Sequence, residues 1–229
     1  LCTTDSSKNF RGLVGIVSDG KIQKVGLIDS NIVGNLYIGG LVGCLSGTSI
    51  IQSCYNTGNV KGCENVGGIC GAVWCGNILS CYNIGQVEGT SCVGGVCGVI
   101  KNSPLSKIQC CYNTNHVKGQ KYVGGVVGDL SSGRILSYYN TGQVEGLNQV
   151  GGVAGGVNKA CISILIQYCY NTGQVKGDSN AGGVAGCLTL TNVKFCFNTG
   201  DVTGKNKVGG VAGTLNLKLQ SCYNVGKVK

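Results

Sequence analysis

Short runs in which apolar and polar residues alternate recur along this chain. The run G-x-V-x-G places Val60, Val87 and Val117 between an amide or imidazole side chain and a charged one, and later copies keep the pattern. This alternation has a period of 2, which is typical of a half-buried β-strand. Because Gly, Val, Asn and Thr dominate each run and strong helix formers are sparse, we expect strands and no helices.

A block of the form Gly-Gly-apolar-x-Gly accompanies each strand pattern. Its second glycine recurs every 27 to 31 residues, at Gly40, Gly68, Gly95, Gly125, Gly152, Gly183 and Gly210. A motif of the form C-Y-N-T-G-x-V-x-G follows each block, and the 14 residues from its start to the next block admit no insertion. Only the stretch between block and motif varies in length. The constant segment indicates in-register pairing with its copies, and the variable one indicates a corner that accepts loops.

A fixed repeat of this length predicts stacked units. One turn of short strands per repeat, with Gly supplying positive φ and close backbone approach at the bends, predicts a parallel β-solenoid, or β-helix. We expect an all-β chain in which residues 1–229 form one continuous solenoid of about eight turns of ~27 residues, right-handed by the crossover preference. The first turn near Arg11–Val14 and the final strand Gly226–Lys229 lack capping partners, and Lys229 of one copy would meet Asn31–Val33 of the next.

Three rows of equivalent residues accompany the predicted stacking. We expect the asparagine row to form amide hydrogen bonds from turn to turn, and the cysteine row to serve as small apolar core residues. The aromatic row is either core packing or, if exposed, a binding strip for sugars or a partner protein. The asparagine row is Asn56, Asn83, Asn113, Asn140, Asn171, Asn198 and Asn224. The cysteine row is Cys54, Cys81, Cys111, Cys169, Cys196 and Cys222, interrupted by Tyr138. The aromatic row is Tyr55, Tyr82, Tyr112, Tyr139, Tyr170, Phe197 and Tyr223.

The chain has 16 cysteines, which favours mostly free, buried thiols because equivalent positions carry Val, Ala or Tyr. An alternative for the cysteines outside the rows is that one or two disulfide bridges join them. No zinc or other metal site is expected, because C-x-x-C is absent and His116 is the only histidine.

The charged positions support the predicted register. The residue after the strand valine reads Lys61, Glu88, Lys118, Glu145 and Lys176, so the sign alternates from turn to turn. The net charge is +9, but the basic residues are scattered, so we expect no nucleic-acid partner and only weak attraction to anionic glycans or cell surfaces. No run of 18 apolar residues occurs, so membrane insertion is not expected.

The glycine block, the C-Y-N-T-G-x-V-x-G motif and the period near 27 together resemble the GLUG-motif repeat proteins, over about Arg11 to Lys229. Such repeats are found in large bacterial cell-surface and secreted proteins, including adhesin-like proteins and the non-catalytic part of some IgA-cleaving metallopeptidases. The resemblance implies a surface-exposed β-solenoid and transfers no catalytic residue. The metallopeptidase zinc motif H-E-x-x-H is absent from this chain.

No catalytic residue or cofactor is predicted, because no two carboxylates lie on adjacent turns of one row. We expect a structural rod or stalk of an extracellular or cell-surface protein, adhesin-like, that stacks end to end on itself as a filament or on flanking repeats. Surface glycans or host proteins are further candidate partners. The alternatives are a carbohydrate-binding or carbohydrate-active solenoid and the non-catalytic stalk of a surface metallopeptidase.

Two further hypotheses concern binding surfaces. Ligand contacts outside the rows would come from the longest corners, Val99–Gln109 and Gly156–Tyr168. A weaker hypothesis, an ice-binding face, rests on a threonine row interrupted by Ile84 and Val225. That row is Thr57, Thr114, Thr141, Thr172 and Thr199.

Overall fold

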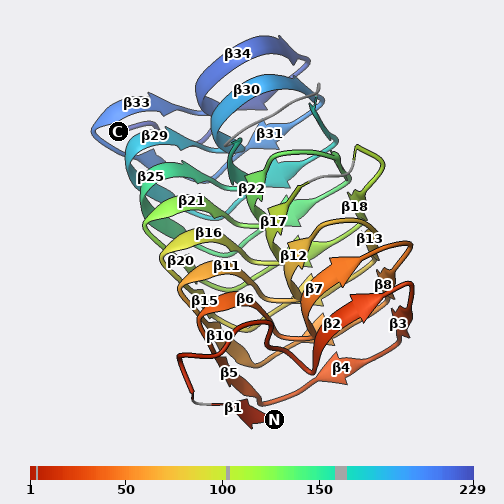
Figure 1. Cartoon of the computed structure of the whole chain (residues 1–229). Helices are drawn as coiled ribbons and strands as arrows, with labels where there is room; N and C mark the ends of the chain where they lie inside the picture. The colour runs from red at the N-terminus through yellow and green to blue at the C-terminus, as the bar shows by residue number, and fades with distance from the viewer. Residues whose placement is uncertain (4, 102–103, 158–163) are drawn as a thin grey trace.

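A computed structural model describes residues 1–3, 5–101, 104–157 and 164–229, and these residues form strands and turns without a helix. The chain winds about seven turns of about 27 residues into a parallel β-solenoid whose two termini lie at opposite ends of the stack (Figure 1). The predicted all-β parallel solenoid is therefore confirmed. Within the described ranges there is no helix long and apolar enough to span a membrane.

Three parallel sheets of 13, 14 and 8 strands run the length of the solenoid. The first sheet has two rows of strands, which merge where β25 and β29 run through both. One row is β1 (Cys2–Thr3), β5 (Asn31–Val33), β10 (Asn59–Lys61), β15 (Val87–Glu88), β20 (Val117–Lys118), β25 (Val144–Gly151), β29 (Val175–Gly182) and β32 (Val202–Thr203). The other row is β6 (Leu36–Gly39), β11 (Glu64–Gly67), β16 (Ser91–Gly94), β21 (Lys121–Gly124), β25, β29 and β33 (Asn206–Gly209).

The second sheet also has two rows, joined in the last turns by β30 and β34. One row is β2 (Val14–Ser18), β7 (Val42–Ser46), β12 (Cys70–Val73), β17 (Cys97–Ile100), β22 (Val127–Leu130), β26 (Ala154–Gly156), β30 (Ala185–Lys194) and β34 (Ala212–Gln220). The other row is β3 (Lys21–Gln23), β8 (Ile50–Gln52), β13 (Asn77–Leu79), β18 (Lys107–Gln109), β23 (Arg134–Leu136), β27 (Ile164–Gln167), β30 and β34.

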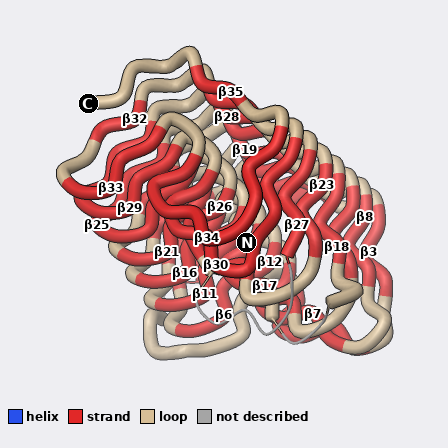
Figure 2. The backbone as a smooth tube through the Cα atoms, turned by 90° about the horizontal axis from the view of Figure 1, so that it is seen from above, coloured by secondary structure: helices blue, strands red, loops and turns tan. Residues whose placement is uncertain are grey.

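The third sheet consists of two-residue strands and completes each turn. Its strands are β4 (Gly26–Leu27), β9 (Tyr55–Asn56), β14 (Tyr82–Asn83), β19 (Tyr112–Asn113), β24 (Tyr139–Asn140), β28 (Tyr170–Asn171), β31 (Phe197–Asn198) and β35 (Tyr223–Asn224). Seen along the axis, copies of each strand lie over one another from turn to turn (Figure 2).

Equivalent residues of successive repeats pair directly, as the constant spacing predicted. Val60 pairs with Val87 and Lys61 with Glu88 in the first sheet, and Asn83 pairs with Asn113 in the third. From β5 onward, length variation is confined to the corner between the two rows of the second sheet, whereas the first turn also has one residue more between β4 and β5 than the next turn has between β9 and β10. In β30 and β34 this corner is absent, and only a register shift between Thr189 and Asn192 remains.

The main apolar core runs along the axis. Inward valines such as Val87, Val117 and Val144 are fully buried, and so are the apolar residues of the glycine blocks in the central turns, whereas Ile16 and Leu217 in the end turns are exposed. Complete burial of one valine stabilises the fold by about 1.5–3 kcal/mol before the entropy of ordering the chain is subtracted. The alternation read from G-x-V-x-G therefore corresponds to one buried side chain per short strand.

The prediction that the repeat glycines supply positive φ at the bends is wrong. Two rows of non-glycine residues adopt the left-handed conformation there; Ser53 (φ 53°) and Cys92 (φ 53°) are examples. One row is Lys24, Ser53, Ser80, Cys110, Ser137, Tyr168, Phe195 and Ser221. The other is Phe10, Tyr37, Asn65, Cys92, Tyr122, Gln149, Asn180 and Lys207.

The repeat glycines instead permit close contact between turns. A Cβ placed on Gly128 would lie 2.5 Å from the carbonyl carbon of Cys92 in the preceding turn. Real Cβ atoms do not approach backbone this closely, so any larger residue would push the turns apart. The glycines are therefore required by packing between turns, whereas the bends themselves accept ordinary residues.

The first turn also differs from the prediction. β1 pairs with β5, with Cys2 opposite Asn31, so the solenoid begins before Arg11–Val14. The predicted meeting of Lys229 of one copy with Asn31–Val33 of another is therefore wrong, because β1 already covers that strand.

Candidate functional site

The asparagine row forms a continuous ladder of amide hydrogen bonds inside the solenoid. In the central turns, Nδ2 of Asn83 donates to Oδ1 of Asn113 at 2.9 Å, and Nδ2 of Asn113 donates to Oδ1 of Asn140 at 2.9 Å. Each amide also donates to the backbone of its own bend; Asn113, for example, bonds the carbonyl of Asn115 at 2.7 Å. The side chains from Asn56 to Asn198 have 0% exposure. The row has no free face to offer a ligand, and its geometry is that of a structural ladder.

The cysteine row lies on the same inner side. Sγ of Cys81 contacts the carbonyl of Leu79 at 3.2 Å, and the amide of Cys81 donates to Sγ of Cys111 at 3.3 Å. Hydrogen bonding to Cys111, together with burial, raises the pKa of Cys81 to about 12, and burial raises the pKa of Cys169 well above its usual value. Such cysteines stay protonated at neutral pH, so they are poor nucleophiles and poor metal ligands.

The described cysteines are all free. Cys63 and Cys110 are exposed, whereas Cys2 and Cys161 lie outside the residues whose side chains are described. Tyr138 fills the gap in the cysteine row and is 1% exposed. Its hydroxyl has no hydrogen-bond partner, and burial raises its pKa well above the usual value. The interior therefore accepts a bulky ring where other turns place a thiol.

The aromatic row lies on the outer side of the third sheet and is half-buried, except for the exposed Tyr223. Consecutive ring centroids are 4.6 to 5.2 Å apart with interplanar angles of 3 to 8°. Each ring face is thus covered by its neighbours, and edges and hydroxyls are what solvent reaches. Partial desolvation, with Tyr112 and Tyr55 alongside, raises the pKa of Tyr82. Because sugar stacking needs a free ring face, this arrangement does not favour a carbohydrate strip along the row.

Asp129, Asp178 and Asp201, three carboxylates that an enzyme could use if they converged, lie in three different rows. Asp129 is 3% exposed in β22, where Ser131 donates to both of its oxygens at 3.1 Å. Asp178 pairs with Lys205 at 3.0 Å, and Asp201 pairs with Lys229 at 3.6 Å. These three carboxylates do not converge, so they form no general acid–base pair.

Cys111 and His116 also do not form a catalytic pair. Sγ of Cys111 points inward and contacts the carbonyl of Gln109 at 3.3 Å. His116 lies on the outer side of the first sheet, with Nε2 3.7 Å from Glu145. No group of three or more His, Cys, Asp or Glu side chains that could hold a metal ion occurs in the described part of the chain.

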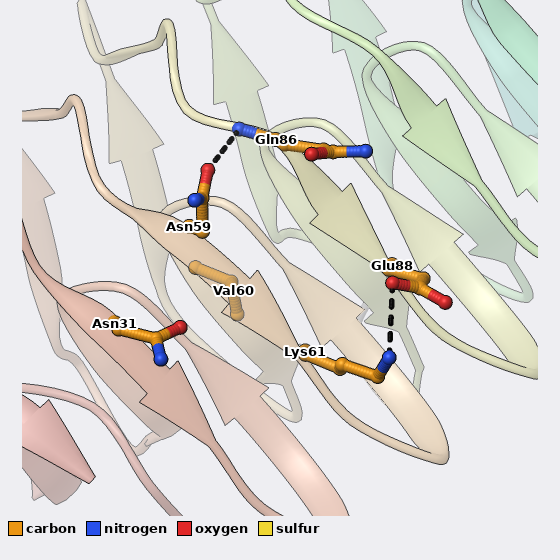
Figure 3. A pocket seen from close by; sticks show the side chains of 6 residues that line it. All are labelled: Asn31, Asn59, Val60, Lys61, Gln86 and Glu88. Carbon is orange, nitrogen blue, oxygen red and sulfur yellow. Dashed lines mark hydrogen bonds and ion pairs between the residues drawn. The ribbon is translucent and has the colours of Figure 1, made fainter. Parts of the chain in front are cut away.

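A shallow hollow of about 170 Å³ lies on the outer face of the first sheet (Figure 3). It is lined by the amide side chains of three turns and by an ion pair between Lys61 and Glu88, whose charged atoms are 3.1 Å apart. Oδ1 of Asn59 accepts a bond from the backbone amide of Gln86 at 3.2 Å. Sites for drug-sized ligands enclose about 300–1,000 Å³, so this hollow could accept at most a small polar group.

A second apolar cluster, which the sequence analysis missed, lies outside the main core. Cys44, Ala72 and Val99 are buried there. Phe10, Tyr37 and Trp74 cover them, with the rings of Phe10 and Tyr37 stacked at 4.8 Å and Trp74 edge-on to both. Phe10 and Tyr37 occupy the same position of successive turns, but the next two turns carry Asn65 and Cys92 there and Trp74 lies at another position, so no continuous aromatic row marks this cluster in the sequence.

The predicted ligand-binding corners are described only in part. Residues 102–103 of Val99–Gln109 and residues 158–163 of Gly156–Tyr168 lie outside the described residues. Members of the threonine row are exposed, except for the half-buried Thr57.

Comparisons with known proteins agree with this architecture. The family model described as the GLUG motif matches residues 34–61, and no curated protein sequence matches the chain. The fold resembles the crystal structure of a Bacteroides ovatus protein provisionally described as an immunoglobulin A1 protease, with a TM-score of 0.62 and 17% identity. That match covers 97% of this chain and 79% of the other, and at this identity it shows a shared fold alone. The predicted resemblance is thus confirmed at residues 34–61, and the chain is a β-solenoid that carries the GLUG motif.

Proposed function

We propose that this chain is a structural rod or stalk of an extracellular or cell-surface protein, adhesin-like in its role. The observation that carries the proposal is the division between the two sides of the turns. On the inner side, the asparagine and cysteine rows pack between stacked turns, and on the outer side Glu88, Asp178 and Asp201 are each paired with a lysine. A stack of this kind provides length and a repetitive surface, as repeat proteins commonly do.

The proteins to which this chain is similar support an extracellular or cell-surface location. The resemblance to GLUG-motif proteins, matched at residues 34–61, implies a surface or secreted protein, and the Bacteroides ovatus structure that shares this fold carries a protease description. The solenoid would then hold a catalytic or adhesive part away from the cell without performing chemistry itself. Labelling of intact producing cells with an antibody against the solenoid, before and after external protease treatment, tests the location. Signal only after cell lysis would refute it.

A carbohydrate-active solenoid is the competing class. A glycan array and a reducing-end assay on the purified chain separate the two, because a rod gives no turnover and an enzyme gives turnover that a carboxylate substitution removes. Asp129→Asn is the first variant to test, since Asp129 is the most buried of the three carboxylates singled out above. Sustained turnover by the parent chain would overturn the structural role.

The partner most consistent with the solenoid ends is a further GLUG turn. Each asparagine donates to the next one toward the C-terminus, ending with Asn198 to Asn224 at 2.7 Å. The position of this row in the first turn is Leu27, which pairs with Asn56 and offers no side-chain acceptor. A flanking repeat with asparagine would accept a bond from Asn224, whereas the first turn of a second copy would not. Flanking repeats are therefore favoured over self-stacking into a filament.

Sedimentation velocity tests this choice. The isolated chain should sediment as a monomer over a wide concentration range, and a variant with Leu27→Asn should associate more strongly than the parent. Filaments formed by the parent chain at low concentration would show that self-stacking does not need a continuous asparagine row.

A further inference from the structure

Five tyrosines of the aromatic row stand in unbroken contact on an accessible side of the solenoid. Ring centroids of consecutive members are 5.2, 4.9, 4.6 and 5.2 Å apart, and the rings are within 8° of parallel. All five side chains are half-buried, so a diffusing oxidant can reach them. We propose that these residues form an oxidative cross-linking site, in which dityrosine bonds join consecutive turns of the rod. They are Tyr55, Tyr82, Tyr112, Tyr139 and Tyr170.

The backbone holds each pair in place for coupling. Tyr82 pairs with Tyr112 in the parallel ladder of the third sheet, and the asparagine that follows each tyrosine is tied to its neighbour from inside. Two phenoxyl radicals in separate molecules must meet by diffusion. Two radicals in adjacent turns are already within contact distance, so coupling becomes a step within one molecule. The register of the solenoid thus selects which tyrosines join.

The reaction needs a one-electron oxidant, for which a haem peroxidase with hydrogen peroxide serves. Each of two phenols loses one electron and one proton, giving two phenoxyl radicals, and one peroxide molecule takes up both electrons and both protons to form two waters. The radicals join through a new carbon–carbon bond between ring carbons adjacent to the hydroxyl-bearing carbons. The hydrogen on each joined carbon then leaves as a proton while a proton returns to each oxygen, which restores both phenols. The product has lost two hydrogen atoms relative to the parent chain.

The rest of the structure supplies internal controls. Each of these five rings stacks on another tyrosine, whereas Tyr37 stacks on Phe10 and Tyr168 on Phe195. Tyr223 stacks on Phe197, which cannot form a phenoxyl radical, so the row of phenols stops at Tyr170. Tyr138 is on the inner side and 1% exposed, out of reach of the oxidant.

The test oxidises the purified chain at low micromolar concentration with peroxidase and limiting peroxide. Reducing gel electrophoresis removes any disulfide from the exposed cysteines, dityrosine fluorescence reports the bond, and mass spectrometry of peptides locates it. We expect a monomeric product whose cross-links join consecutive members of the five, with a thermal midpoint raised by several degrees. The same chain in urea should lose this pairing and give intermolecular products.

Two variants make the assignment specific. Phe197→Tyr should extend the row, so that Tyr223 enters cross-links that the parent lacks. Tyr112→Phe keeps the stack, as Phe197 does naturally, and should remove every bond to position 112 while sparing the Tyr55–Tyr82 pair. The proposal is overturned if the folded parent gives mainly concentration-dependent dimers, if Tyr37 or Tyr168 dominates the products, or if Phe197→Tyr leaves Tyr223 unmodified.

Discussion

Replacing one central member of the asparagine row should destabilise the solenoid more than any surface asparagine does. Asn113→Ala removes three hydrogen bonds: one accepted from Asn83, one donated to Asn140, and one donated to the carbonyl of Asn115. Each bond contributes about 1 kcal/mol net, and buried groups left without partners add about 1–3 kcal/mol. Because these groups are fully buried, we expect a loss of about 3–5 kcal/mol in the free energy of unfolding.

Urea titration followed by far-UV circular dichroism measures this loss, and hydrogen exchange in the neighbouring turns localises it, since a solenoid can unfold unit by unit. The matched control is Asn59→Ala, because Asn59 is exposed and its side chain accepts a bond from the backbone amide of Gln86. A loss below about 1 kcal/mol for Asn113→Ala, or equal losses for both variants, would refute the assignment of stability to the row.

A charged replacement adds a test by pH. Asn113→Asp keeps an acceptor for Asn83 but cannot donate to Asn140 while ionised, and its charge would be buried. Burial should raise the folded-state pKa of this carboxyl above the unfolded value of about 3.9. The protonated form is then favoured by folding, so the variant should regain stability as pH falls through the raised pKa. Stability of the variant that is independent of pH between neutral and mildly acidic conditions would contradict a buried ladder.

Three further outcomes follow from the geometry. Gly128→Ala should cost about 1–3 kcal/mol or more in unfolding free energy, because its Cβ would lie 2.5 Å from backbone of the preceding turn, whereas a Cβ on Gly20 would lie 3.0 Å from a side-chain methyl of Val17 and 3.8 Å from the nearest backbone atom, so Gly20→Ala should cost less. Glu88→Lys places three lysines in one outer row and should lower the thermal midpoint at low salt, with the difference removed at high salt. Hydrogen bonding to Cys111 raises the pKa of Cys81 from 9.0 to about 12, so the protonated thiol of Cys81 stabilises the fold below pH 9. This stabilisation should be lost as pH rises from 9 to 12, and urea titrations of the parent and of Cys81→Ala over this range would show it.

The register of the solenoid could be predicted because the glycine block and the motif that follows it recur seven times along the chain. A segment that never accepts an insertion must pair with its copies, and the alternating signs of Lys61, Glu88 and Lys118 are compatible with that pairing. The interior of the short strands followed from the same pattern, since the flanking residues of each valine are polar. A single strand of this length is too short to show which side is buried, but seven copies of the same short alternation identified the buried position.

The bends could not be predicted, because their conformation is imposed by the stack. The left-handed rows hold Ser, Cys, Tyr, Phe, Lys, Gln and two asparagines, and only the asparagines favour this conformation by themselves. Hydrogen bonds between turns hold them: the amide of Ser53 donates to the carbonyl of Leu79 at 3.0 Å, and Ser80 donates to Gln109 at 2.9 Å. Such strained positions persist where the surroundings over-determine them. The side of the sheet taken by the aromatic rings was equally hidden, because a two-residue strand is too short to show alternation.

The aromatic row is unusual among the outer rows of this solenoid in its uniformity. The outer row that contains Lys61 and Glu88 changes side chain from turn to turn, whereas an aromatic ring stands at seven successive positions from Tyr55 to Tyr223. A half-buried position does not need a ring to fill space, but stacked pairs add about 0.5–1.5 kcal/mol each, so the row reinforces from outside the stacking that the asparagine row secures from inside. Phe197 keeps this ring contact and lacks the hydroxyl, so stacking accounts for the ring but not for the phenols. The oxidative chemistry of the phenols is therefore separable from the stability of the rod, which is why Phe197→Tyr and Tyr112→Phe can change cross-linking while the fold is retained.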